Sequence, residues 1–196
     1  WGNPWRRVFP ALVAQGTREG VFSFVIALLV YVATQSELKL GNYSFITSGA
    51  ALLSFILVGR WIKREYRSPF MLLGSLAMAL AVLPFFWEVN YVTLLLFGLG
   101  SSLFFPFFVI PITSTVFDLI GRDQTSVRMR VEYVVFRELA LNLGRILGTL
   151  LFIVVATFYR TPQTMNWLLF SIGSVPILAW YFLRRLHVKP KMNFYS

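Results

Sequence analysis

Six apolar segments, each about as long as a bilayer is thick, dominate this sequence. A helix that spans a membrane needs about 20 consecutive and mostly apolar residues. With charged and turn-forming residues taken as breaks, the predicted helices cover about 8–34, 43–62, 69–87, 91–120, 131–158 and 164–183. The connections between them are short. We therefore expect an all-α, polytopic membrane protein whose residues 1–196 form a single six-helix transmembrane domain.

The composition supports a lipid environment. Hydrophobic residues make up 57% of the chain and charged residues 13%, and the mean hydropathy is +0.69. The formal net charge of +10 would fit nucleic-acid binding if the chain were soluble. Lysine and arginine lie instead in the short connections between apolar segments, a distribution typical of membrane proteins. The expected partner is therefore the lipid bilayer and not nucleic acid.

The basic residues also predict an orientation. Lys39 and Arg160 lie on one side of the predicted membrane, and most of the other lysines and arginines lie on the opposite side. These are Arg6, Arg7, Arg60, Lys63, Arg64, Arg67, Arg122, Arg128, Arg130, Arg184, Arg185, Lys189 and Lys191. Because basic connections stay in the cytoplasm, we expect both termini to be cytoplasmic and the membrane to be the plasma membrane.

The first predicted helix carries ionisable residues deep in the membrane. Gln15, Arg18 and Glu19 lie about 10 residues from its cytoplasmic end, which is roughly 15 Å at the rise of an α-helix. Gln15 and Glu19 are four residues apart and share a face, with Arg18 beside them. Ionisable residues at this depth are costly, so each needs a partner or a water-filled cavity.

The fifth predicted helix carries a matching polar stripe, formed by Glu138, Asn142 and Arg145 at helical spacing. We expect it to meet the polar residues of the first helix. One interpretation is a charge-paired network, Arg18 and Arg145 against Glu19 and Glu138, that only neutralises itself. The other is a substrate and proton pathway, in which an arginine holds an anionic substrate and a glutamate carries a proton.

Two motifs of small residues predict close helix packing. They are Gly16-x-x-x-Gly20 in the first helix and Gly144-x-x-x-Gly148 in the fifth. At the cytoplasmic end of the fourth helix, Asp118 is expected to pair with Arg122.

The connection after the second helix carries a recognisable pattern. It reads Gly59-Arg-Trp-Ile-Lys-Arg-Glu-Tyr-Arg67 and is similar to the Gly-x-x-x-Asp-Arg-x-Gly-Arg signature of the major facilitator superfamily. Gly59, Arg64 and Arg67 match, whereas Lys63 replaces the acid and Tyr66 the second glycine. With the glycine- and proline-marked segment 97–106 and the count of six helices, the chain resembles the carboxy-terminal half of such a transporter.

This resemblance implies a fold and a function. The fold is a 3+3 inverted repeat, and the chain, which opens on Trp1, is expected to be a fragment of a twelve-helix protein. The implied function is secondary active transport of a small-molecule substrate by alternating access, with proton coupling inferred from the buried glutamates. The partner is the missing amino-terminal half or, in a homodimer, a second copy. We expect this partner to dock on the face of Gly144 and Gly148. Independently of the resemblance, Pro106 and Pro111 are expected to bend or break the fourth helix.

Other functions are weighed against transport. A non-transporting membrane scaffold, or a half-transporter that acts only as a dimer, stays open. A membrane enzyme is disfavoured, because the single histidine, His187, lies in the basic tail and the aspartates lie at a helix end and in a connection. We therefore predict no catalytic residue, no metal and no cofactor, and the sequence does not identify the substrate.

Overall fold

The computed structural model describes residues 4–121, 128–159 and 161–187. Its regular elements are all helical, which confirms the predicted all-α class. Six helical segments are long and apolar enough to cross a membrane, and the third of them, Arg64–Phe86, consists of a helix with a short 3₁₀ turn at each end. The helices are α1 (Trp5–Thr34), α2 (Glu37–Trp61), α3 (Arg67–Leu80), α4 (Tyr91–Ile120), α6 (Arg130–Phe158) and α7 (Pro162–His187). Two 3₁₀ turns, η1 (Arg64–Tyr66) and η2 (Leu83–Phe86), flank α3.

The beginning of α2 differs from the prediction by six residues, because the polar segment 35–42 is mostly helical. The chain reverses at Gln35, which adopts a left-handed conformation with φ 48°. Ser36 then caps α2 by accepting a hydrogen bond from the backbone N–H of Lys39, and Glu37 lies in the first turn. A serine cap and an acidic residue in the first turn favour the start of a helix, so residues 37–42, which the sequence predicts as a connection, are the first turns of α2.

The third predicted helix is interrupted and the fourth is not. α3 ends at Leu80, and Pro84 lies in the 3₁₀ turn that follows. α4 begins at a capping box in which Asn90 and Thr93 bond each other's backbone N–H groups at 3.0 and 2.9 Å. It continues through Pro106 and Pro111 to Ile120, so of the expected bend or break the structure excludes a break.

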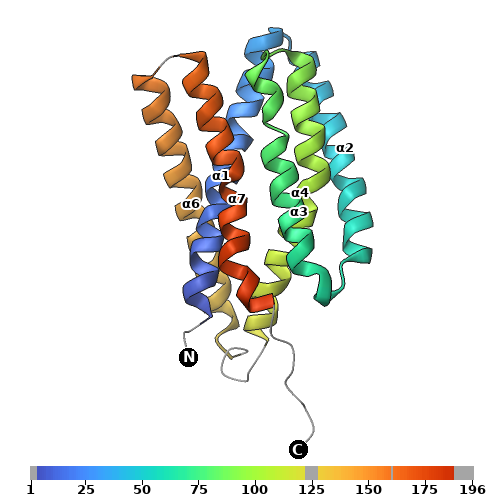
Figure 1. Ribbon diagram of the computed structural model, residues 1–196, viewed down its shortest axis with the longest axis vertical. Coiled ribbons are helices and arrows are strands. Elements are labelled where there is room, and N and C mark those ends of the chain that lie inside the picture. Colours follow the sequence, from blue (N-terminus) through green and yellow to red (C-terminus); the bar gives the residue numbers. More distant parts are fainter. Residues whose placement is uncertain (1–3, 122–127, 160, 188–196) are drawn as a thin grey trace, which may run out of the picture.

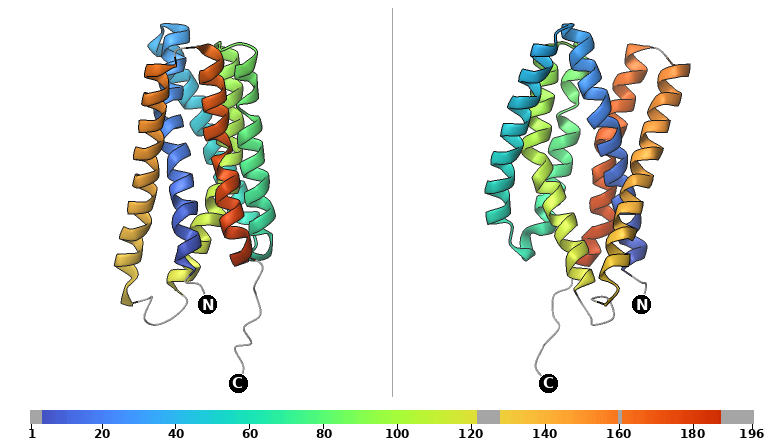
Figure 2. Two further views of the ribbon diagram at one scale, coloured as in Figure 1. Left: turned by 60° about the vertical axis from the view of Figure 1, so that its left-hand side comes forward. Right: turned by 180° about the vertical axis from the view of Figure 1, so that it is seen from behind.

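The helices alternate in direction along the bundle (Figure 1). α1 packs against α6 and α7, α4 packs against α2 and α3, and α3 packs against α7. α2 and α6 lie at opposite edges, as Figure 2 shows from behind. Many of their large apolar side chains are exposed, with Phe45 of α2 81% exposed and Leu139 of α6 62% exposed. Such surfaces face either lipid or another protein surface.

Two apolar clusters form the core, one toward each end of the bundle. α1 contributes Val8, Ala11 and Leu12 to the first cluster and Val21 and Val25 to the second. Between them, α1 carries buried polar side chains. The hydrophobic core is therefore interrupted near the middle of the bundle.

Candidate functional site

Arg18 lies at this interruption. It is about 20 Å along α1 from Trp5 and about 24 Å from Thr34, so it sits near the midpoint of the helix. Its side chain is buried, with 6% of the residue exposed. A charge at this position needs compensation from its neighbours, because the bilayer supplies none.

The compensation is incomplete. The Nη2 atom of Arg18 donates a hydrogen bond of 3.2 Å to the Ser101 hydroxyl of α4. Its guanidinium carbon lies 5.0 Å from the ring centroid of Phe22, within the range of a cation–π contact. The Nε atom is buried and has no hydrogen-bond partner among the described residues. Within the same part of the chain, no carboxylate forms an ion pair with Arg18.

Glu19, the next residue, serves a different helix. Its Oε2 accepts a hydrogen bond of 2.9 Å from Nη2 of Arg145 on α6, and its Oε1 accepts one of 2.7 Å from Nε2 of Gln15. Arg145 also donates to the Asn142 side chain at 3.1 Å. Gln15, Glu19, Arg145 and Asn142 therefore form one chain of hydrogen bonds that joins α1 to α6.

Glu138 lies outside this chain. It pairs with its own neighbour, Arg137, and its side chain is 47% exposed. Asn142 reaches Glu138 only through the backbone carbonyl, at 2.9 Å. Of the predicted four-charge network, the structure forms the pair Glu19–Arg145. Glu138 pairs with Arg137, which the predicted network does not include, and Arg18 makes no ion pair among the described residues. Helical periodicity predicts the face on which a residue lies but not its rotamer, and the rotamer of Glu138 brings its carboxylate to Arg137.

The glycine motifs lie at the crossing of α1 and α6. The contacts pair Gly16 with Leu141, Gly20 with Arg145, Gly144 with Val13, and Gly148 with Thr17. A Cβ on Gly20 would lie 2.7 Å from the Cα of Arg145, closer than side chains tolerate. This close approach places Arg145 beside Glu19. The expected docking of a missing half on Gly144 and Gly148 is wrong, because α1 already occupies that face.

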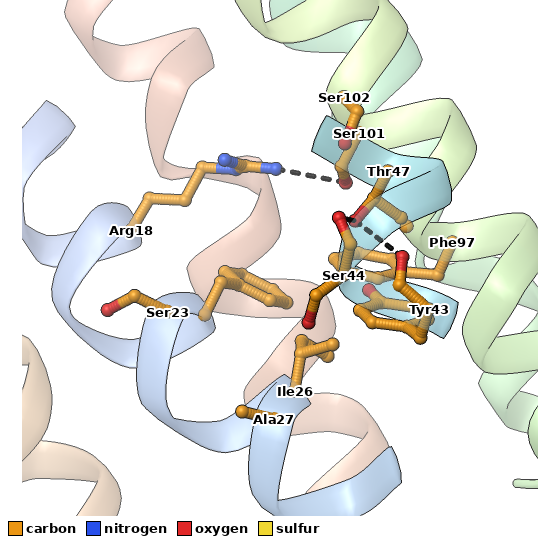
Figure 3. Close-up of a pocket in the computed structure, with 12 residues that line it drawn as sticks. Arg18, Ser23, Ile26, Ala27, Tyr43, Ser44, Thr47, Phe97, Ser101 and Ser102 are labelled. Atoms are coloured by element: carbon orange, nitrogen blue, oxygen red, sulfur yellow. Dashed lines mark hydrogen bonds between the residues drawn. The ribbon is translucent and has the colours of Figure 1, made fainter. Parts of the chain in front are cut away.

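A pocket opens around Arg18 (Figure 3). It consists of two adjoining hollows of about 270 and 460 Å³, both lined by Arg18, Phe22, Ser23, Ser101 and Ser102. We call it the mid-depth pocket. In Figure 3 the guanidinium of Arg18 points across it toward Ser101.

The walls of the mid-depth pocket come from four helices. Tyr43, Ser44 and Thr47 of α2 line the smaller hollow, and Glu19 and Arg145 line the larger one. The sequence interpretation missed all the lining residues of α2 and α4. A usable signal was present, namely hydroxyl side chains within otherwise apolar membrane segments.

The signature-like connection is tied to α4. The side chains of Arg67 and Arg64 approach Oδ2 of Asp118 at 2.5 and 3.5 Å. Gly59 is exposed, and a Cβ there would meet nothing within 4 Å. The predicted partner of Asp118, Arg122, lies outside the described residues. Among the described residues, Asp118 ties the 3₁₀ turn η1 and the start of α3 to α4.

The comparisons identify one relative. The chain is similar to the uncharacterized protein YqgE of Bacillus subtilis (strain 168), with 32% identity over 187 residues. The match covers 95% of this chain and 44% of that protein, so the chain spans less than half of the relative's length. No protein-family model matches the chain, and no solved structure matches it significantly. Among the described residues, no group of His, Cys, Asp or Glu is placed to hold a metal ion.

Proposed function

We propose that this chain is one six-helix half of a secondary active transporter of the major facilitator type, which moves a small solute across the membrane by alternating access. The observation that carries the proposal is the mid-depth pocket, where Arg18 is buried without an ion-paired carboxylate among the described residues and Glu19 pairs across helices with Arg145. Ionisable residues at membrane depth mark substrate and ion pathways. Transporters of this class bind substrate near the midplane, where two repeats meet.

The packing order of the helices supports an inverted repeat. Exchanging α1 with α4, α2 with α6 and α3 with α7 maps the α1–α6 contact onto α4–α2, and α1–α7 onto α4–α3. The α3–α7 contact maps onto itself. The two triplets are α1, α2, α3 and α4, α6, α7. Their first helices, α1 and α4, start at opposite ends of the bundle, so the two triplets run in opposite directions (Figure 1). This is the relation expected of a 3+3 inverted repeat.

The partner of this half is, in our proposal, a second set of six helices. More than half of the Bacillus relative lies outside the match, which is enough chain for another half of similar size. The apolar surfaces of α2 and α6 flank the polar residues of the mid-depth pocket, and the second half would cover them. A second copy of this chain is the alternative occupant, and a non-transporting scaffold would use the same surfaces.

The proposed orientation places both termini in the cytoplasm of a cell whose plasma membrane holds the protein. Its support is that the start of α1, the end of α2 and the starts of α3 and α6 lie at one end of the bundle, and the start of α2 lies at the other (Figure 1). The first group of helix ends carries Arg6, Arg60, Arg67 and Arg130, and the start of α2 carries Lys39. Because this chain contains no cysteine, single cysteines at exposed positions of the two ends report the orientation directly. An impermeant thiol reagent applied to intact cells should label the Lys39 end and not the opposite one.

Proton coupling is proposed to run through Glu19. Protonation of its carboxylate would weaken the bond to Arg145 and so loosen the α1–α6 crossing. The test is uptake by the full-length protein in proteoliposomes with and without a pH gradient. Glu19→Gln should abolish gradient-driven accumulation and keep solute exchange, whereas Glu138→Gln, a matched change outside the pocket, should keep both.

Two results would oppose this function. Gradient-driven accumulation that survives Glu19→Gln removes the assigned proton carrier. Absence of uptake or exchange over a broad panel of anions, sugars and organic cations, by protein that is folded in the liposomes, removes transport itself and leaves the scaffold.

A further inference from the structure

The chemistry of the mid-depth pocket points to a substrate class, and this step rests on the proposed transport function for its biological meaning. We propose that the pocket binds a monocarboxylate with a small, flat apolar body. The carboxylate pairs with the guanidinium of Arg18, and the apolar body lies against Phe22 and Phe97. The argument uses the charge of the lining, its hydrogen-bond donors and its aromatic wall.

The net charge of the pocket selects a monoanion. Its ionisable lining consists of Arg18, Glu19 and Arg145, with Tyr43 as a phenol. Glu19 and Arg145 cancel as an ion pair, so one positive charge remains. A cationic solute would be repelled by that charge, and a dianion would exceed it in a medium where unpaired charge is costly.

The hydrogen-bond donors select a carboxylate over a neutral group. An arginine offers five N–H donors in a planar fork that matches a carboxylate through two parallel bonds. In the structure, Arg18 uses Nη2 on Ser101, and its Nη1 has no hydrogen-bond partner among the described residues, whereas Nε is buried. Ser101 accepts this bond and keeps its own hydroxyl hydrogen to donate. The hydroxyls of Ser44 and Ser102 form no hydrogen bond within the described part of the chain and line the same pocket.

The aromatic wall selects an apolar body. The rings of Phe22 and Phe97 are stacked with centroids 5.2 Å apart and an interplanar angle of 22°. Both line the smaller hollow, together with Ile26 and the side chain of Tyr43 (Figure 3). Its volume of about 270 Å³ suits a compact solute, since small-molecule sites begin near 300 Å³.

A self-contained structural role for Arg18 makes a different prediction. In that case the contacts to Ser101 and Phe22 already stabilise the guanidinium, and a ligand gains nothing from it. The two roles separate by comparing ligands that differ only in charge, which requires no change to the protein.

The experiment is binding to the full-length protein in lipid nanodiscs, measured calorimetrically and as ligand-induced thermal stabilisation. The ligands are phenylacetate, its amide, phenethylamine as the cation, phthalate as a dianion, and acetate as a carboxylate without the ring. We expect phenylacetate to bind at least tenfold more tightly than each of the others. Arg18→Gln should weaken phenylacetate roughly 10- to 100-fold, the range for a charged hydrogen bond. Arg60→Gln, at an exposed arginine outside the pocket, should leave its affinity unchanged.

Several results overturn the inference. They are equal binding of acid and amide, preference for the cation, lack of any binding at millimolar phenylacetate, or full affinity in Arg18→Gln. If Arg18→Gln does not fold, the test uses Ser101→Ala and Arg18→Lys. The proposed geometry is opposed if Ser101→Ala keeps its selectivity for the acid over the amide and Arg18→Lys binds phenylacetate as tightly as wild type.

Uptake assays on the same protein separate this inference from the proposed function. If phenylacetate binds through Arg18 but neither it nor any solute of the panel is transported or exchanged, the site stands and the transporter is removed. Transport of sugars or cations that phenylacetate does not inhibit leaves the transporter and removes the carboxylate site.

Discussion

The crossing of α1 and α6 should be intolerant of a single added methyl group. We take Gly20→Ala as the perturbation, since a Cβ at Gly20 would lie 2.7 Å from the Cα of Arg145 and 2.8 Å from its carbonyl oxygen. Non-bonded carbon atoms prefer a separation of about 3.5–4.0 Å. α6 must therefore retreat by about 1 Å, because the obstructing atoms are backbone and cannot rotate away.

The expected cost follows from two opposing effects. Forcing an extra methyl group into a packed site costs about 1–3 kcal/mol. Replacing glycine by alanine inside a helix returns up to about 1 kcal/mol. Subtracting the second effect from the first gives a net loss of about 0–2 kcal/mol in the free energy of unfolding, centred on about 1 kcal/mol. The same retreat would lengthen the bond between Arg145 and Glu19, now 2.9 Å, beyond the range of a hydrogen bond at about 3.2 Å.

The assay is thermal unfolding of the purified protein in detergent, beside a matched control. Gly49→Ala makes the same chemical change in the interior of α2, where a Cβ would meet nothing within 4 Å. Gly20→Ala should lower the unfolding midpoint by a few degrees, and Gly49→Ala should leave it unchanged or raise it. Equal stabilisation by both substitutions would refute the close approach of α1 to α6.

Three smaller predictions use the same unfolding assay. Ser54→Ala removes the hydroxyl that donates a hydrogen bond of 2.5 Å to the Leu103 carbonyl and so links α2 to α4. The loss should lower the free energy of unfolding by about 0.6–1.7 kcal/mol. Asp118→Asn weakens the ion pair with Arg67 and, because the carboxylate is 38% exposed, should cost only about 0.2–1 kcal/mol, a loss that shrinks at high salt. Asn90→Ala removes the cap of α4 and should cost about 0.5–2 kcal/mol, whereas an unchanged midpoint would show that the cap is replaced by solvent.

The sequence predicts the helices well because length and hydropathy alone determine which segments span a bilayer. It fails where polar residues are helical, as in residues 37–42, since hydropathy cannot distinguish a solvated helix turn from a loop. At Pro106 and Pro111, where the sequence predicts a bend or a break, α4 is unbroken. Neighbouring helices and side chains can satisfy the freed backbone groups around a proline in a membrane helix.

The candidate site divides in the same way. Arg18, Glu19 and Arg145 could be found from the sequence, because charge at membrane depth is rare and costly. The pairing of Glu19 with Arg145 lies within the predicted network, but the other contacts could not be found, because periodicity fixes the face of each residue on its own helix and not the rotation of one helix against another. The sequence therefore does not indicate the contact of Arg18 with Ser101. It also places Glu138 in the predicted charge network, whereas Glu138 pairs with Arg137 in the structure.

Arg18 and Glu19 are consecutive, yet they contact different helices, since successive residues of an α-helix point about 100° apart. Arg18 reaches α4 through Ser101, and Glu19 reaches α6 through Arg145. Under the proposed function, an anion bound at Arg18 acts on the α1–α4 contact while a proton on Glu19 acts on the α1–α6 contact. One turn of α1 would then sense both ligands through separate interfaces. A movement of α1 relative to both neighbours, which alternating access requires, would let each ligand change the affinity for the other.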